Sequence, residues 1–179
     1  MDDSTGDTWF ADYCRWRLGR LSPIVTNLAL ARPGVVASMS DPGLCFFGIC
    51  GTASNAIDGD IDGNWANESV AHSFFTNKPY WQVDLGNSFA LEELELWNRT
   101  DCCAARLQNF DVFVSDNPFV STDPAVTAMQ PGVLRIHQGP APGRVFASPI
   151  NRSGRYIRIQ LLGSSDPLQL AEVLVYGVR

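Results

Sequence analysis

Apolar residues alternate with polar residues in short segments from residue 27 to the C-terminus. In residues 155–162, for example, Ile157, Ile159 and Leu161 fall on one face of an extended segment, because successive side chains of a strand point to opposite faces. Similar segments cover residues 81–85, 89–97, 110–114, 133–136 and 170–176, with turn residues between them. We therefore expect an all-β fold: an antiparallel β-sandwich or jelly roll of about eight strands, with long loops at one end forming the binding site.

Two stretches depart from this pattern. Residues 1–26 mix aromatic side chains with arginines at a spacing that allows a short amphipathic helix. We treat them as an N-terminal extension of unknown role before a domain spanning residues 27–179. Residues 124–149 are rich in Pro and Gly and are expected to form loops around one strand. A chain of 179 residues with 45% hydrophobic content fits one main domain.

The net charge of -6 excludes some classes of partner. The sequence has no basic cluster that would attract a phosphate backbone, so we expect no nucleic-acid partner. It has no apolar run long enough to span a membrane. The acidic start also lacks the basic and apolar regions of a signal peptide.

Five cysteines, at positions 14, 45, 50, 102 and 103, lack the paired spacings of a zinc site. Cys102 and Cys103 are adjacent, and neighbouring Cα atoms lie about 3.8 Å apart, below the usual disulfide span of about 4.4 to 6.8 Å. From the cysteines alone, two reduced thiols are the simpler interpretation. Cys45 and Cys50 enclose a four-residue loop that a bridge would close, whereas Cys14 is left over.

A specific motif lies in the centre of the chain. Twenty-six residues separate His72 from Arg99, and Asp101, Cys102, Cys103 and Arg106 follow. This order and spacing resemble the signature of the F-type lectin (fucolectin) family, which belongs to the discoidin-like sandwiches. The resemblance extends over residues 27–179 and includes residues 53–59, 80–86, 154–157 and 172–177.

The resemblance implies a sugar-binding role for the motif. A neutral sugar offers hydroxyl and ring oxygens, and guanidinium groups supply rigid donor forks for them. In the family, such residues converge on α-L-fucose, which implies that His72, Arg99 and Arg106 bind its axial 4-hydroxyl, its 3-hydroxyl and its ring oxygen. Asp101 is expected to orient an arginine. The implied protein is a non-catalytic, extracellular lectin that binds fucosylated glycans and meets membranes only through glycoconjugates.

The family also packs the apolar side of fucose against a disulfide between adjacent cysteines. The resemblance therefore favours a Cys102–Cys103 bridge, conditional on an oxidising history. Phe46, Phe47 and Trp65 are candidates for the rest of this apolar wall. Each of the three is equally consistent with an ordinary core aromatic residue.

A structural Ca²⁺ site is a further implication of the resemblance. Oxygen ligands suit this hard cation, and the matching positions are Asn55, Asp58, Asp60, Ser69, Ala171 and Glu172. The alternative is an Asx-rich turn at residues 58–63 that needs no ion. Val70 and Ala171 replace a cysteine pair found in many family members.

Two other functions remain open. An enzyme would need a nucleophile with a base, or paired carboxylates, and neither stands out; of the two histidines, His137 is expected to be structural or exposed. A discoidin-like module would bind membrane lipid or protein through exposed loop tips such as Phe46 and Phe47. For a lectin, weak monosaccharide binding favours multivalency, through a homo-oligomer or a tandem parent protein.

Overall fold

The computed structural model describes residues 24–163 and 166–179. Its strands are β1 (Val25–Asn27), β2 (Val36–Met39), β3 (Cys45–Phe46), β4 (Ile49–Cys50), β5 (Ala71–His72), β6 (Tyr80–Trp97), β7 (Phe110–Ser115), β8 (Leu134–Gln138), β9 (Val145–Leu161), β10 (Gln169–Leu170) and β11 (Glu172–Val178). The helical segments are the 3₁₀ turns η1 (Ala53–Ile57), η2 (Trp65–Asn67) and η3 (Ala104–Arg106), and the α-helix α2 (Pro124–Met129). The expected all-β class is confirmed.

Two strands are much longer than the sequence pattern indicated. The segments expected at residues 81–85 and 89–97 are one strand, β6, and β9 begins ten residues before the expected start at residue 155. The apparent break at Gly86 is a bend, with a register irregularity between Asp84 and Phe89. Gly86 has a φ of +83°, and a Cβ there would lie 2.5 Å from the Gly34 carbonyl oxygen, so the bend requires glycine.

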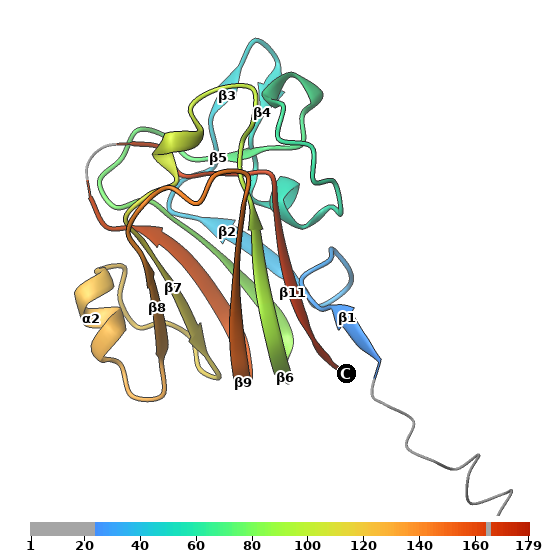
Figure 1. Ribbon diagram of the computed structural model, residues 1–179, viewed down its shortest axis with the longest axis vertical. Coiled ribbons are helices and arrows are strands. Elements are labelled where there is room, and N and C mark those ends of the chain that lie inside the picture. Colours follow the sequence, from blue (N-terminus) through green and yellow to red (C-terminus); the bar gives the residue numbers. More distant parts are fainter. Residues whose placement is uncertain (1–23, 164–165) are drawn as a thin grey trace, which may run out of the picture.

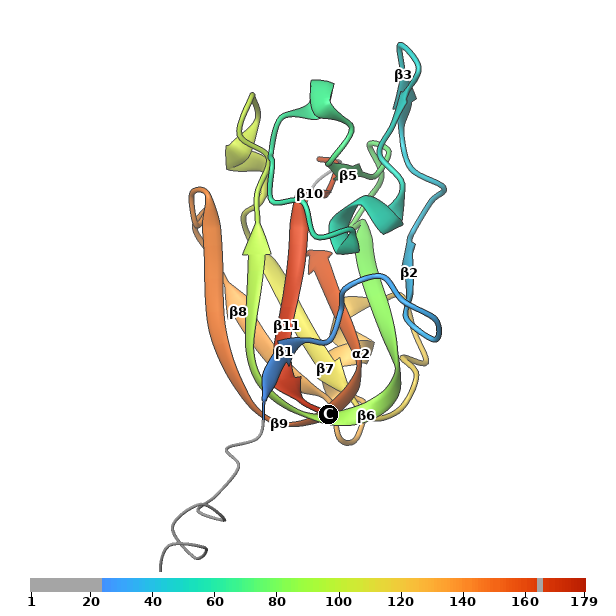
Figure 2. The same cartoon turned by 90° about the vertical axis from the view of Figure 1, so that its right-hand side faces the viewer.

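The bends let β6 and β9 contribute to both layers of a sandwich (Figure 2). The second half of β6 pairs with β11 and with the first half of β9, and β1 extends this layer beyond β11. The first half of β6 pairs with β2 and with the second half of β9, which continues through β7 to β8. Every one of these pairs is antiparallel, and strands that bend from one layer to the other form the corner of the sandwich.

The apolar faces of the two layers enclose the core. Trp81, Val83, Ile157 and Ile159 come from one layer and Leu94 from the other, and all five are fully buried. Each buried side chain of this size stabilises the fold by about 1.5 to 3 kcal/mol relative to its exposed state. The alternation seen in the sequence therefore marks the core faces of both layers.

Residues 124–149 contain more regular structure than expected. Besides β8, they include α2 and the first residues of β9. Asp123 caps α2 by accepting a hydrogen bond from the Ala125 backbone N–H at 2.8 Å, and Pro124 fits the first helical turn, where its missing N–H costs nothing. The pattern failed here because a six-residue helix carries too little periodicity to be recognised.

The long loops gather at one end of the sandwich, shown at the top of Figure 1, where β3, β4 and β5 lie. Two small antiparallel pairs, β3 with β4 and β5 with β10, order this end. Cys14 and most of the amphipathic helix predicted in residues 1–26 fall within residues 1–23, which lie outside the described residues. Within the part of the chain that the structure describes, no helix is long and apolar enough to cross a membrane.

Candidate functional site

Three short segments bring His72, Arg99 and Arg106 together at the loop end. His72 lies on β5, Arg99 follows the end of β6, and Arg106 ends η3. A fourth side chain, Gln169 on β10, lies between them: its amide oxygen accepts hydrogen bonds from Nη1 of Arg99 at 3.0 Å and from Nη1 of Arg106 at 3.2 Å. The same oxygen lies 2.6 Å from Nε2 of His72. The motif residues thus meet around one oxygen atom.

A two-pronged ion pair holds Arg99 in place. Its Nε and Nη2 atoms donate to the two carboxylate oxygens of Asp101, each at 2.8 Å, and the Trp65 backbone N–H donates to Asp101 as well. The hydrogen bonds from Arg99, with a further contribution from the Trp65 N–H, lower the pKa of Asp101 to about 2. The carboxylate is therefore ionised at physiological pH and fixes the plane of the guanidinium group.

His72 is buried, with 3% of its surface exposed. Its Nδ1 atom lies 2.7 Å from the Ser73 carbonyl oxygen. Burial lowers the pKa of His72, the hydrogen bond to Ser73 opposes this, and the charges of Arg99 and Arg106 lower it further. We therefore expect a neutral imidazole near pH 7.

Two aromatic rings lie against these groups. Trp65 packs edge-on against His72, with 5.2 Å between ring centroids, and the Arg99 guanidinium carbon lies 5.5 Å from the Trp65 ring centroid. The Arg106 guanidinium carbon lies 5.4 Å from the centroid of Phe75, an exposed ring. Gly51 is needed beside them, because a Cβ there would come 2.6 Å from the His72 Cβ and 2.8 Å from Cζ3 of Trp65.

The Cys102–Cys103 bridge is present, and it lies between the two arginines in the chain. Cys103 adopts a left-handed backbone conformation at the start of η3, and its carbonyl oxygen accepts from the Arg106 backbone N–H at 2.9 Å. The buried Asn98 side chain anchors this loop by donating to the carbonyl oxygens of Ala104 and Gly143, each at 2.9 Å. The bridge and Arg106 therefore belong to one fixed turn.

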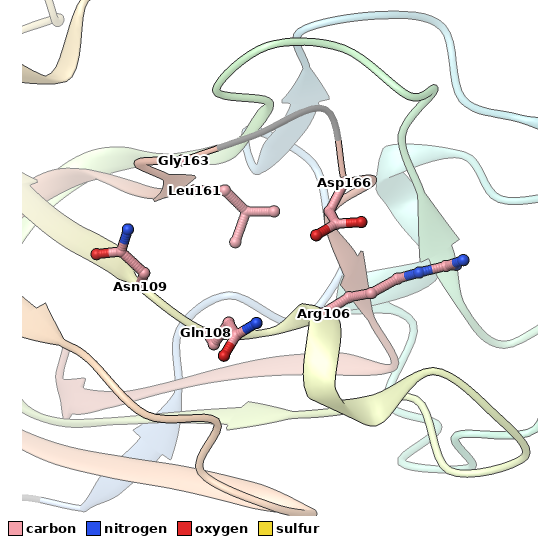
Figure 3. A pocket seen from close by; sticks show the side chains of 6 residues that line it. All are labelled: Arg106, Gln108, Asn109, Leu161, Gly163 and Asp166. Carbon is pink, nitrogen blue, oxygen red and sulfur yellow. The ribbon is translucent and has the colours of Figure 1, made fainter.

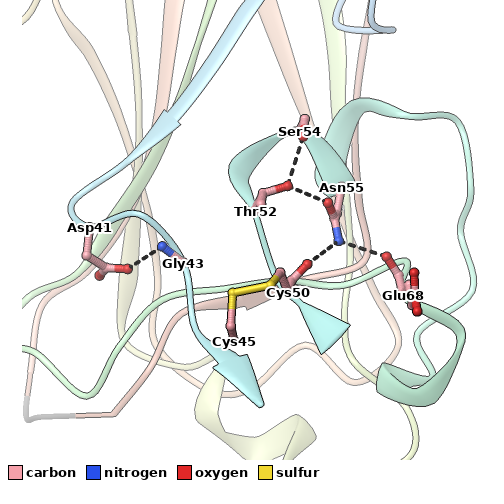
Figure 4. Close-up of a disulfide and its surroundings, with 8 residues drawn as sticks. All are labelled: Asp41, Gly43, Cys45, Cys50, Thr52, Ser54, Asn55 and Glu68. Carbon is pink, nitrogen blue, oxygen red and sulfur yellow. Dashed lines mark hydrogen bonds between the residues drawn. A yellow bond between two sulfur atoms is a disulfide. The ribbon is translucent and has the colours of Figure 1, made fainter. Parts of the chain in front are cut away.

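A second disulfide, Cys45–Cys50, closes the β3–β4 hairpin (Figure 4). Phe46 and Phe47 contact each other at its tip in a tilted arrangement, 4.2 Å between ring centroids, and are 56% and 90% exposed. The rings that lie against the motif residues are thus Trp65 and Phe75, while Phe46 and Phe47 project from the hairpin. Of the three aromatic residues predicted for the apolar wall, the structure brings Trp65 to the motif.

A cavity of about 280 Å³ adjoins Arg106. Figure 3 shows the six residues that line it, Arg106, Gln108, Asn109, Leu161, Gly163 and Asp166. In this view the Arg106 side chain extends away from Asn109 and Leu161, with Asp166 above its stem. The cavity therefore lies beside the group of motif residues and shares only Arg106 with them.

Acidic residues gather at the start of β11, where a metal site was predicted. Glu172 is fully buried, and neither of its carboxylate oxygens has a hydrogen-bond partner. Burial first, then the charge of Asp58 and a smaller effect of Asp60, raise the pKa of Glu172 to about 8, against an opposing effect of the Gly59 and Asp58 backbone. Burial also raises the pKa of Asp58. A buried carboxylate with no partner is costly, and a cation beside it would remove that cost.

The other predicted metal ligands are engaged differently. The Asn55 side-chain oxygen accepts from the Thr52 hydroxyl at 2.6 Å, and its amide nitrogen donates to the carbonyl oxygens of Cys50 and Glu68 (Figure 4). The Ser69 hydroxyl donates to the Asp62 carbonyl oxygen. Ala171, which is buried, has only a backbone oxygen to offer.

Within residues 24–163 and 166–179, no three His, Cys, Asp or Glu side chains come close enough to hold a metal ion. A cation at Glu172 would therefore need backbone carbonyl oxygens as well as carboxylates. Such oxygens, like carboxylates, are ligands that Ca²⁺ accepts. The residues present thus fit Ca²⁺ and not a transition metal.

Sequence reasoning missed Gln169 and Phe75. Phe75 stands three positions after His72, and an exposed pair of aromatic residues beside a candidate binding histidine was a usable signal. Gln169 gave none, because ninety-six residues separate it from His72 and only the β5–β10 pairing brings them together.

The comparisons with known proteins agree with this geometry. A family model described as a NedA-like, galactose-binding domain matches residues 55–159, more than half of the chain. The fold and the site thus define a discoidin-like β-sandwich of the galactose-binding-domain class.

More similar proteins narrow the family. Fucolectin of Anguilla anguilla is 31% identical over 131 residues, which cover 69% of this chain and 75% of that protein. A fucose binding module of Streptococcus pneumoniae is 30% identical, with a TM-score of 0.69, and the match covers 88% of this chain and 98% of that one. An f-lectin from Morone saxatilis serum is 28% identical, with a TM-score of 0.70, and the match covers 87% of this chain and 50% of that one. The chain belongs to the fucolectin (F-type lectin) family, and the resemblance inferred from the motif is confirmed.

Proposed function

We propose that the chain is a non-catalytic lectin domain that binds terminal α-L-fucose on glycans. The observation that carries this proposal is the meeting of His72, Arg99 and Arg106 around one oxygen position, with a vicinal disulfide between the two arginines in the chain. Relatives whose names state fucose binding share the fold and about 30% of the sequence. The discoidin-like lipid-binding alternative is less well supported, since it gives no reason for this cluster.

The chemistry of the cluster suits a neutral sugar. Arg99 is fixed by Asp101 and presents the remaining edge of its guanidinium group as a donor fork. Together with Arg106 and His72, it can engage the axial 4-hydroxyl, the 3-hydroxyl and the ring oxygen of fucose. An epimer that leaves a buried donor unpaired loses about 1 to 3 kcal/mol for each such group. The apolar face of the sugar would lie on the Cys102–Cys103 bridge and Trp65.

The direct test is a calorimetric titration with L-fucose, accompanied by a glycan array and by vesicles that contain phosphatidylserine. We expect saturable binding to L-fucose, enrichment of fucosylated glycans on the array, and no binding to the vesicles. Lipid binding without fucose binding would favour the discoidin-like alternative. Release of free sugar from a fucosylated glycoside would show an enzyme instead.

We further propose a structural Ca²⁺ ion at Glu172. The support is the buried carboxylate with two unpartnered oxygens, close enough to Asp58 for the charge of Asp58 to raise its pKa. The ion would join β11 to the loop after η1, with Asp58 and Glu172 as its carboxylate ligands and backbone oxygens as the others. Its chemical contribution would be to hold the buried Glu172 carboxylate and the exposed Asp58 carboxylate ionised beside each other, so we assign it a role in stability.

Removing the vicinal disulfide should weaken sugar binding without unfolding the sandwich. We expect a Cys102→Ser, Cys103→Ser variant to lose about tenfold in affinity for L-fucose, corresponding to about 1.4 kcal/mol of apolar contact. Its melting temperature should change little, because a bridge between adjacent residues closes almost no loop. Calorimetry and thermal unfolding measure the two quantities.

The matched control is a Cys45→Ser, Cys50→Ser variant, which removes the hairpin bridge and leaves the vicinal one. We expect it to loosen the β3–β4 hairpin and retain most of the fucose affinity. Full affinity of the Cys102→Ser, Cys103→Ser variant would contradict the role of the bridge as part of the sugar contact.

The proposed partners and location follow from the same assignment. A fucose-binding domain meets membranes through glycoconjugates, and the two disulfides form and persist in an oxidising, extracellular environment. Serum is the source of the f-lectin from Morone saxatilis. Weak monosaccharide binding is strengthened by multivalency, so we propose that the domain acts in a homo-oligomer or a tandem protein.

A further inference from the structure

Gln169 lies among the three side chains that the proposed sugar contact requires. The pairing of β10 with β5 places it directly opposite His72. Cross-strand partners carry their side chains on the same face of the sheet, with Cβ atoms about 5 Å apart. The Gln169 amide oxygen accepts from Nη1 of both Arg99 and Arg106 and lies 2.6 Å from Nε2 of His72. One oxygen of the protein itself therefore engages all three groups.

This arrangement leaves His72 without a ring nitrogen for a ligand. Nδ1 faces the Ser73 carbonyl oxygen at 2.7 Å, and Nε2 faces the Gln169 amide oxygen. His72 and Gln169 are 3% and 2% exposed, and the Arg99 side chain is 11% exposed. A ligand hydroxyl can reach Nε2 of His72 only when the Gln169 amide moves away.

We propose that Gln169 is a specificity-determining residue: its amide oxygen fills the place of a ligand hydroxyl in the sugar-free protein, and the sugar displaces it. This role rests on the proposed function, since the displacing ligand is the fucose-like sugar. The Gln169 oxygen thereby keeps the two guanidinium groups in their binding geometry before the sugar arrives. Every ligand must then compete with this oxygen for the same hydrogen-bond donors.

A hydroxyl suits the three groups better than an amide oxygen does. The neutral His72 ring has one proton for two nitrogens that both face oxygens. The Gln169 oxygen at Nε2 and the Ser73 oxygen at Nδ1 can both only accept, so the single ring proton leaves one of these two contacts without a hydrogen bond. A sugar hydroxyl can donate its proton to Nε2 and still accept from Arg99 and Arg106. The exchange therefore selects ligands with a free hydroxyl at this point and rejects those with an ether oxygen or a hydrogen there.

The test compares two substitutions at this position by calorimetry with L-fucose. Gln169→Ala removes the competing oxygen and should raise the affinity about tenfold, the effect of about one hydrogen-bonded acceptor. Gln169→Glu places a carboxylate against two guanidinium groups, a pairing about twice as strong as a neutral hydrogen bond, and should lower the affinity at least about tenfold. The backbone pairing of β10 with β5 does not involve the side chain, so both variants should fold.

Gln138→Ala is the matched control, because Gln138 is also a glutamine on a strand; its amide nitrogen donates to the Pro140 carbonyl oxygen at 2.8 Å. It should bind L-fucose with unchanged affinity. If the wild type binds L-fucose and Gln169→Ala binds it equally well or more weakly, the proposed displacement is wrong. Gln169 would then be a support for the arginines. Failure of the wild type and of Gln169→Ala to bind L-fucose would instead overturn the proposed function.

Discussion

Replacing Arg106 with alanine should lower the affinity for L-fucose at least about a hundredfold while the domain stays folded. Hydrogen bonds that involve a charged group contribute about 1.5 to 3 kcal/mol each, so the loss of two of them is enough for this factor. Arg106 ends the short η3 turn, and its guanidinium carbon lies 5.4 Å from the centroid of the exposed Phe75 ring. No core packing depends on it. Calorimetry gives the affinity, and the melting temperature reports the fold.

Arg152→Ala is the matched control for this experiment. Arg152 lies on β9 and forms a surface ion pair with Asp116 at 3.5 Å, a contact worth about 0 to 1 kcal/mol. Its removal should leave fucose affinity unchanged. Retained affinity in a folded Arg106→Ala variant would contradict the assigned site.

The sequence could predict the part of the site whose residues lie close together along the chain. Arg99, Asp101, Cys102, Cys103 and Arg106 lie within eight consecutive residues. A single turn of chain after β6 therefore fixes the ion pair of Arg99 with Asp101 and the vicinal bridge. Spacing along such a turn translates directly into proximity, so a motif in the sequence is sufficient to find these groups.

The non-local part escaped prediction for a physical reason. Gln169 meets His72 through the pairing of two strands of two residues each, which is too short for any alternation to show. The bend at Gly86 was also missed. In the sequence this glycine looks like a turn between two strands, but in the structure it lies inside one strand, β6, where the strand passes from one layer to the other. For Phe46 and Phe47, the direction of the hairpin tip depends on the loop that carries it and not on its apolar character, so their contact with the sugar stays a prediction.

Removing Ca²⁺ should lower the melting temperature of the domain by about 5 to 10 °C. An ion that binds only the folded state at one hundred times its dissociation constant stabilises it by about 2.7 kcal/mol, and each kcal/mol shifts the melting temperature of a chain of this size by about 2 to 4 °C. The measurement is thermal unfolding in EDTA, with and without excess Ca²⁺. Mg²⁺ should not substitute fully, because it demands a tighter octahedral site. An unchanged melting temperature after exhaustive chelation would contradict the calcium proposal.

Glu172→Gln should abolish this calcium dependence, because it removes a buried carboxylate whose two oxygens have no hydrogen-bond partner among the described residues. In EDTA the variant should melt no lower than the wild type, since a neutral amide replaces a carboxyl group that a pKa of about 8 already keeps mostly protonated near pH 7. Fucose affinity should change little, because Glu172 is not among the groups around the Gln169 oxygen. Glu92→Gln, at an exposed position on β6, is the matched control and should keep the full response to Ca²⁺. A calcium-dependent melting temperature in the Glu172→Gln variant would place the ion elsewhere.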